Sequence, residues 1–118
     1  MDKYIEKRPW GKFEQFTHNE ISTVKIITIN PKKRLSLQYH NKRKEFWRVI
    51  DGSGKVTIGS KVLNAKAQDE FVIKAKQKHR IKGGKNGIKI LEISFGDFDE
   101  SDNVRVEDDF GRVKETRK

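Results

Sequence analysis

The sequence predicts an all-β protein built as one small barrel or sandwich, and three observations carry that prediction. Short runs rich in β-branched and aromatic residues recur along the chain, each bounded by turn-forming residues. No window shows the apolar period of a helix of useful length. The length of 118 residues suits one domain, which can bury about two-thirds of the surface that its unfolded chain exposes.

The expected strands follow one another at roughly even spacing, as in barrels and sandwiches. They are residues 24–29, 35–40, 45–50, 55–58, 61–63, 70–75, 79–82 and 88–95. The turns between them contain proline or glycine: Asn30-Pro31, Asp51-Gly52-Ser53-Gly54, Gly59-Ser60, Gly83-Gly84 and Asn86-Gly87. Short helical pieces are expected only at the two ends of the chain.

Successive side chains of a strand point to opposite faces, so parity assigns residues to the inside or the outside. Ile73, His79 and Ile81 occupy odd positions of one run, and the even positions between them are basic. His79 is therefore expected on the inward, apolar face. Trp10 and Trp47 are expected to pack in the core or to line a cavity.

A second run has an unusual distribution of side chains. Gln38 and His40 share one face of their predicted strand, and the apolar Leu35, Leu37 and Tyr39 share the other. An apolar outer face needs a cover, which we expect to be a terminal segment or a second subunit.

The most informative constellation is Gln38, His40, Glu45 and His79. The first two project together from one strand, Glu45 follows after a tight turn, and His79 comes from a distant strand. Imidazole nitrogen and carboxylate oxygen suit borderline divalent metals, while a carboxamide oxygen is a weaker, neutral ligand. We expect one divalent ion with open positions for water or substrate. Zinc is the expected ion, with cobalt, nickel, manganese or iron as alternatives.

A simpler interpretation takes each residue alone. An inward histidine can be a hydrogen-bonded core residue, and Glu45 can pair with Arg43 or Lys44. Two of the three histidines fall in the constellation, which favours the metal site, and the third, His18, is expected on the surface. The chain has no cysteine, which excludes disulfides and thiolate ligands.

The excess of basic residues favours an anionic partner. Lysine and arginine number 27 against 17 acidic residues, a formal net charge of +10. A small phosphate ranks above nucleic acid, and so does a lysine-rich solvated surface without a partner, because residues 97–109 are acidic and aromatic residues do not alternate with the basic clusters. No signal peptide or membrane span is visible, so we expect a cytoplasmic protein without a membrane partner.

Motifs along most of the chain resemble one family. Gln38-x-His40, Glu45 and Gly52 match the spacing of the first cupin motif, and His79 matches the last histidine of the second. The segments RPWG, LSLQYH, R-x-E-x-W and EDDFGR begin at residues 8, 35, 43 and 107. They resemble the cupin domain of type II mannose-6-phosphate isomerases, which in many members follows a mannose-1-phosphate guanylyltransferase.

The resemblance implies a single cupin domain over residues 1–118, a jelly-roll β-barrel. Its core would span about 22–96, flanked by the RPWG segment and the acidic C-terminal segment. It implies interconversion of mannose 6-phosphate and fructose 6-phosphate through an enediolate, in the GDP-mannose pathway that feeds polysaccharide synthesis. Nucleotide transfer is not expected of this chain, and a homodimer is expected. The implied metal ligands are Gln38, His40, Glu45 and His79.

A sugar phosphate needs a cation at the mouth of the cavity, and its isomerisation needs a base for the carbon-bound proton. Arg112 and Arg43 lie in the family-like motifs and could offer a guanidinium fork, with Lys25 as a third candidate. Arg112 could instead pair with Asp108 or Asp109. The sequence leaves the base open: an inward carboxylate, a lysine or water on the metal would serve.

One loop departs from the family pattern. The family reads I-P-A-G-T-P-H up to the last ligand, whereas residues 73–79 read IKAKQKH. Lys74, Lys76 and Lys78 stand in place of proline, glycine and proline, so the loop is expected to be less rigid or differently shaped.

Two other functions stay open at this point. A non-haem iron oxygenase also uses two histidines and one carboxylate. A non-catalytic sugar-phosphate-binding module would keep the fold and the cavity without turnover.

Overall fold

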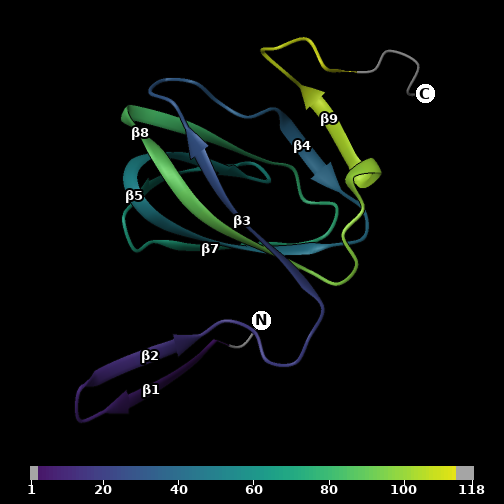
Figure 1. The fold of residues 1–118 in the computed structure, drawn as a ribbon. Helices are drawn as coiled ribbons and strands as arrows, with labels where there is room; N and C mark the ends of the chain where they lie inside the picture. The colour runs from purple at the N-terminus through teal and green to yellow at the C-terminus, as the bar shows by residue number, and fades with distance from the viewer. Residues whose placement is uncertain (1–2, 114–118) are drawn as a thin grey trace.

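The computed structural model describes residues 3–113, and its regular elements are strands and one 3-10 turn (Figure 1). The hairpin of β1 (Tyr4–Arg8) and β2 (Gly11–Gln15) lies apart from a seven-stranded sheet. The sheet contains β3 (Ser22–Ile29), β4 (Leu37–His40), β5 (Lys44–Ile58), β6 (Lys61–Lys66), β7 (Glu70–Ile73), β8 (His79–Phe95) and β9 (Asn103–Glu107). The 3-10 turn η1 (Glu100–Asp102) precedes β9.

The all-β prediction is confirmed, and within residues 3–113 there is no α-helix. Within residues 3–113 the short helical pieces expected at the ends are wrong apart from one 3-10 turn: the N-terminal segment forms a hairpin, and the C-terminal segment forms β9 after that turn. The remaining terminal residues lie outside the described part of the chain. In the described part of the chain, no helix has the length and apolar character that crossing a membrane would require.

Two long bent strands, β5 and β8, organise the sheet. The first half of β5 and the second half of β8 pair with each other and carry β7 and β3 at their sides. The other two halves also pair, and they carry β6 and β4, with β9 beyond β4. Each long strand therefore belongs to both layers, which closes the sheet around one core.

The sequence predicted two separate strands in place of each long one, and this was wrong. The glycines that signal turns lie at bulges inside continuous strands, where the register shifts between Gly52 and Gly54. A Cβ built on Gly54 would lie 2.0 Å from the Lys82 carbonyl oxygen. These glycines therefore allow the close approach and bending of paired strands rather than ending them.

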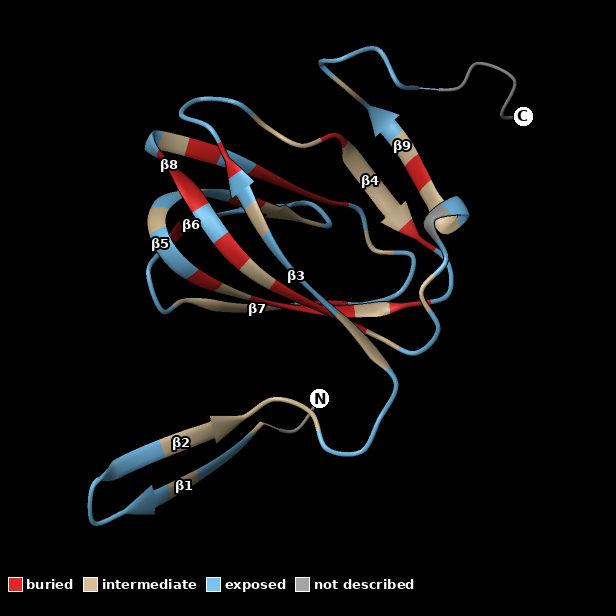
Figure 2. Cartoon of the chain, viewed as in Figure 1, coloured by how far each residue is buried: buried red, intermediate tan, exposed pale blue. Residues whose placement is uncertain are grey.

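The core lies between the two layers. Buried residues follow the inner faces of β5 and β8, red in Figure 2, with Trp47, Ile81 and Ile90 almost inaccessible. On the outer face, the ring centroid of Phe16 lies 5.3 Å from that of Phe46, so the segment after β2 packs against the sheet. Trp47 is buried as expected, but Trp10 is 71 % exposed, so its expected place in the core or cavity is wrong.

The outer position expected for Leu35 is also wrong. Leu35 packs against the buried core, because it precedes β4 and the register shifts between Leu37 and Gln38. This irregularity breaks the alternation on which parity depends. Leu37 and Tyr39 are half-buried, and the C-terminal strand β9 pairs alongside them.

The lysine-rich loop between β7 and β8 keeps a glycine-like backbone. Lys76 has a φ of 69°, in the left-handed region that favours glycine. Its N–H donates to the carbonyl of His40, and the Lys74 N–H donates to the side-chain oxygen of Gln77. The loop that leads into His79 is thereby tied to the end of β4.

Replacing Lys76 with glycine should stabilise the fold. Left-handed backbone is unfavourable for lysine, and this outweighs the entropy that glycine loses on folding, so Lys76→Gly should raise the free energy of unfolding by about 0.5–1 kcal/mol. Equilibrium urea unfolding measures the change. Lys78→Gly is the matched control, since Lys78 has no positive φ, and it should lower stability. A Lys76→Gly protein no more stable than the parent would contradict the prediction.

Candidate metal centre

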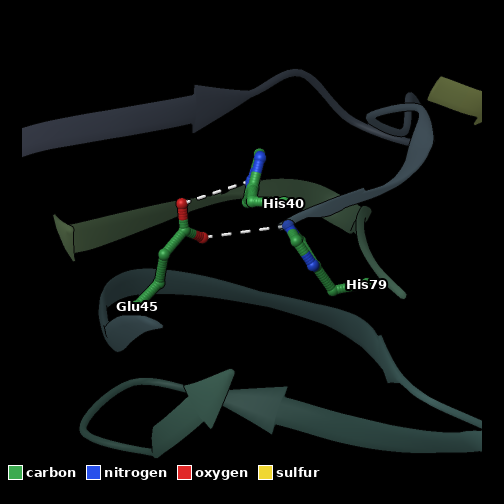
Figure 3. Close-up of side chains that lie close together, drawn as sticks. All are labelled: His40, Glu45 and His79. Carbon is green, nitrogen blue, oxygen red and sulfur yellow. Dashed lines mark ion pairs between the residues drawn. The ribbon is translucent and has the colours of Figure 1, made fainter. Parts of the chain in front are cut away.

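Three strand ends bring two histidines and one glutamate together. His40 is the last residue of β4, Glu45 the second of β5, and His79 the first of β8. All three are buried, and one ligand atom from each lies within 4.8 Å of the others (Figure 3). The His40 Nε2 lies 3.4 Å from Glu45 Oε2, and the His79 Nε2 lies 3.8 Å from Glu45 Oε1.

The second nitrogen of each ring fixes which nitrogen faces the centre. The Nδ1 of His79 lies 2.9 Å from the Gln77 carbonyl, and the Nδ1 of His40 lies 3.3 Å from the Asp102 carbonyl. A carbonyl only accepts, so each Nδ1 carries the proton and each Nε2 keeps its lone pair. Backbone carbonyls commonly orient metal-binding histidines in this way.

Burial also keeps both rings neutral. Desolvation lowers the pKa of His40, against the opposing influence of Glu45, and desolvation likewise lowers the pKa of His79. Neutral imidazole is the form that binds metals.

Glu45 receives several donors from its surroundings. The Trp47 Nε1 donates to Oε1 at 3.3 Å, the Ser94 hydroxyl to Oε2 at 3.3 Å, and the Arg43 Nε to Oε2 at 3.0 Å. The simpler interpretation of a Glu45–Arg43 ion pair is thus realised as well. Both carboxylate oxygens are held in fixed directions, as a metal ligand requires.

The three side chains fit a divalent ion. An ion at about 2.1 Å from each ligand would hold the ligand atoms roughly 3–3.4 Å apart. The two measured Nε2–carboxylate separations are close to that spacing. Gln38, the fourth predicted ligand, lies directly opposite His79 on the β4–β8 ladder and lines a cavity beside the triad. Its coordination of a metal stays a prediction.

A cavity of about 200 Å³ lies beside the triad. The three predicted phosphate-binding residues, Lys25, Arg43 and Arg112, all line it, together with Arg105. The Lys25 ammonium lies 4.2 Å from the ring centroid of Phe98. The ion pair with Asp108, expected as an alternative role for Arg112, is also present, since the Arg112 Nε donates to Asp108 at 2.6 Å.

Sequence reasoning missed Glu92, which lines this cavity and is buried. Glu92 lies between Lys25 and Trp47 in the register of β3, β8 and β5. Burial, followed by the charge of Glu45, raises the pKa of Glu92 to about 7. Parity could have found it, because Ile90 and Glu92 occupy the same inward face of β8.

Known proteins resemble this chain over most of its length. Residues 3–108 match a family model described as mannose-6-phosphate isomerase C-terminal. The chain is 37 % identical over 108 residues to the xanthan biosynthesis protein XanB of Xanthomonas campestris, covering 90 % of this chain and 23 % of that protein. It is 36 % identical to the mannose-1-phosphate guanylyltransferase ManC of Salmonella typhimurium, covering 90 % and 22 %. The chain thus spans less than a quarter of these relatives.

The fold has counterparts among solved structures. A cupin protein from Bacteroides fragilis superposes with a TM-score of 0.59 at 21 % identity, covering 66 % of this chain and 70 % of that one. The prediction of a cupin β-barrel is confirmed by this likeness. Its division into a core at 22–96 and two flanking segments stays a prediction, and parts of both ends lie outside the described residues.

Proposed function

The chain belongs to the family of mannose-6-phosphate isomerase C-terminal domains, and from that premise we propose that it interconverts mannose 6-phosphate and fructose 6-phosphate. One divalent ion would be held by His40, Glu45 and His79, with Gln38 as fourth ligand. The observation that carries the proposal is a buried two-histidine, one-carboxylate cluster beside a cavity lined by basic side chains.

The groups at the cavity have separate proposed roles in an aldose–ketose isomerisation. The ion, zinc by preference, would supply the positive charge that stabilises an enediolate. Lys25, Arg43 and Arg112 are the proposed phosphate-binding groups, because all three line the cavity. Trp47 lines it as well and excludes water from one side.

Glu92 is the proposed group that takes and returns the carbon-bound proton. It is a carboxyl group on the inward face of β8 that lines the cavity; it is not one of the three triad residues, although it hydrogen-bonds to Glu45. Glu45 would be engaged as a ligand, which leaves Glu92 as the second inward carboxylate at the site. The reaction would serve polysaccharide synthesis, a role that the name of the relative XanB, a xanthan biosynthesis protein, supports.

Both triad histidines should be essential for turnover. His40→Ala and His79→Ala should each lower kcat/KM for mannose 6-phosphate by at least about a hundredfold and reduce the bound metal, because each removes a ligand. Turnover is followed as fructose 6-phosphate formed with zinc or cobalt present, and metal content by elemental analysis. His18→Ala, at the exposed third histidine, should change neither quantity. Full activity in both triad variants would refute the proposal.

Removing the acid function of Glu92 should separate turnover from metal binding. Glu92→Gln should keep the metal and lower kcat by about a hundredfold to ten-thousandfold, the usual contribution of a positioned base. Exchange of the C2 proton of the substrate with deuterated solvent should fall in parallel. Glu20→Gln, at an exposed glutamate, is the control. Undiminished proton exchange in Glu92→Gln would assign the base elsewhere.

A homodimer is the proposed assembly. Apolar side chains remain exposed on the hairpin, at Tyr4 and Trp10, and on the outer face of β3, at Val24 and Ile26. Among the described strands, β3 pairs only with β8, so its other edge is open to a partner. A second copy of the chain offers both a projecting hairpin and an apolar sheet face, which suits reciprocal packing.

Light scattering should therefore give about twice the chain mass of 13.8 kDa. The double change Val24→Asp and Ile26→Asp should shift the protein towards monomer, because the second subunit would bury both new charges on the outer face of β3 without partners. Val62→Asp, at an exposed apolar residue of β6, is the control and should leave the mass unchanged. A parent protein of single-chain mass at high concentration would contradict the dimer.

A further inference from the structure

The guanidinium of Arg43 uses two of the atoms that a metal would need. Arg43 is only 7 % exposed. Its Nε donates to Glu45 Oε2 at 3.0 Å, and its Nη2 donates to His40 Nε2 at 3.1 Å. The Nε2 of a neutral imidazole has one lone pair, so it cannot accept this hydrogen bond and bind a metal at the same time.

Arg43 also compensates buried negative charge. Glu45 is 1 % exposed, and a carboxylate at such a depth is costly without a cation or several donors. The fit of the guanidinium is incomplete, however, because its Nη1 is buried with no hydrogen-bond partner among the described residues. A buried donor without a partner is unfavourable, which distinguishes this arrangement from a fully satisfied structural ion pair.

We infer that Arg43 is an internal cation that competes with the divalent ion for His40 and Glu45 and leaves them when the metal binds. The inference rests on the metal site of the proposed function and adds a determinant of its affinity. Arg43 also lines the cavity, so a displaced guanidinium stays beside it, where its donors can meet an anionic oxygen of a sugar phosphate. Metal binding and the release of a phosphate-binding cation would then be one event.

If Arg43 competes with the metal, it should have opposite effects on the metal-free and the metal-bound protein. Without metal, Arg43 stabilises the buried carboxylate. With metal, the ion takes over that role, and the contacts of Arg43 to His40 and Glu45 must be broken first. A neutral side chain of similar length at position 43 should therefore weaken the metal-free fold and strengthen metal binding.

Arg43→Met tests this directly with zinc as the probe. We expect the zinc dissociation constant, measured by competition with a chromogenic chelator, to fall about tenfold to a hundredfold, the equivalent of a charged hydrogen bond. The metal-free melting temperature should fall, and the rise that zinc produces should be larger than in the parent. Arg48→Met is the matched control: Arg48 lies on β5, the strand that follows Arg43, and pairs with Glu14 and Glu70 outside the cavity, so zinc affinity should not change.

The unaltered protein provides a second measurement that does not depend on a variant folding. The side-chain Nε–H signal of Arg43 should be visible by nitrogen-15 NMR and protected from exchange without metal, because it is buried and bonded to Glu45. One equivalent of zinc should shift it and abolish the protection. Displacement predicts this change, whereas charge repulsion at a distance would leave the hydrogen bond in place.

The outcomes separate this inference from the proposed function. Equal zinc affinity in Arg43→Met and the parent, or an Nε–H signal unmoved by bound zinc, overturns the inference even if the isomerase assay succeeds. Arg43-dependent zinc binding without isomerase turnover supports the inference and overturns the function. Failure of parent and variant alike to bind zinc or any of the alternative ions, cobalt, nickel, manganese and iron, overturns both.

Discussion

The site depends on one constraint: a carboxylate placed inside a small barrel must be matched by positive charge. Glu45 lies among Trp47, Ser94 and two histidines, and none of these supplies a formal cation while the rings are neutral. Its compensation must come from Arg43 or from a metal. Trp47 and Ser94 donate from β5 and β8, whose inward positions are set by the packing of the core, and Arg43 donates from the turn before β5.

The ends of three strands, β4, β5 and β8, meet at the metal centre, and the turns and loops between them fix the side chains of the site. The Asp102 carboxylate accepts the N–H groups of Asn41 and Lys42 in the turn between β4 and β5, and the Asp102 carbonyl orients His40. The loop before β8 bonds to the backbone of His40 through Lys76. Local backbone geometry therefore couples the two histidines independently of any metal. Lys76 keeps its unfavourable left-handed backbone because the hydrogen bond to His40 and the adjoining strands determine its conformation.

The sequence predicted the site better than the course of the strands. Parity and spacing brought His40, Glu45 and His79 together because the residues between them form regular strands and tight turns, where side-chain direction follows from position. Glycine signals misled at Gly52 and Gly54, because a glycine that permits a bend looks the same in sequence as one that ends a strand. Leu35 was misplaced where a register shift broke the alternation. The sequence offered Glu45 as a partner of Arg43 but gave no sign of the second contact, to His40, because that contact depends on the three-dimensional positions of both side chains.

The net charge of the chain has a local counterpart at the cavity, and under the proposed function this charge would link the binding of the metal to that of the substrate. Four basic side chains line it, with Glu92 in the lining and Glu45 just beneath, while Asp108 offsets one of the four, Arg112. Adding a divalent cation alone would increase the positive excess, which is unfavourable in a partly desolvated space. A phosphate dianion would cancel that increase. Under the proposed function, the ion and the phosphate group would therefore stabilise each other's binding through the charge of the cavity, and Arg43, present in either state, would lie between them. A neutral sugar would lack this contribution, so under the proposed function charge alone would favour a phosphorylated substrate.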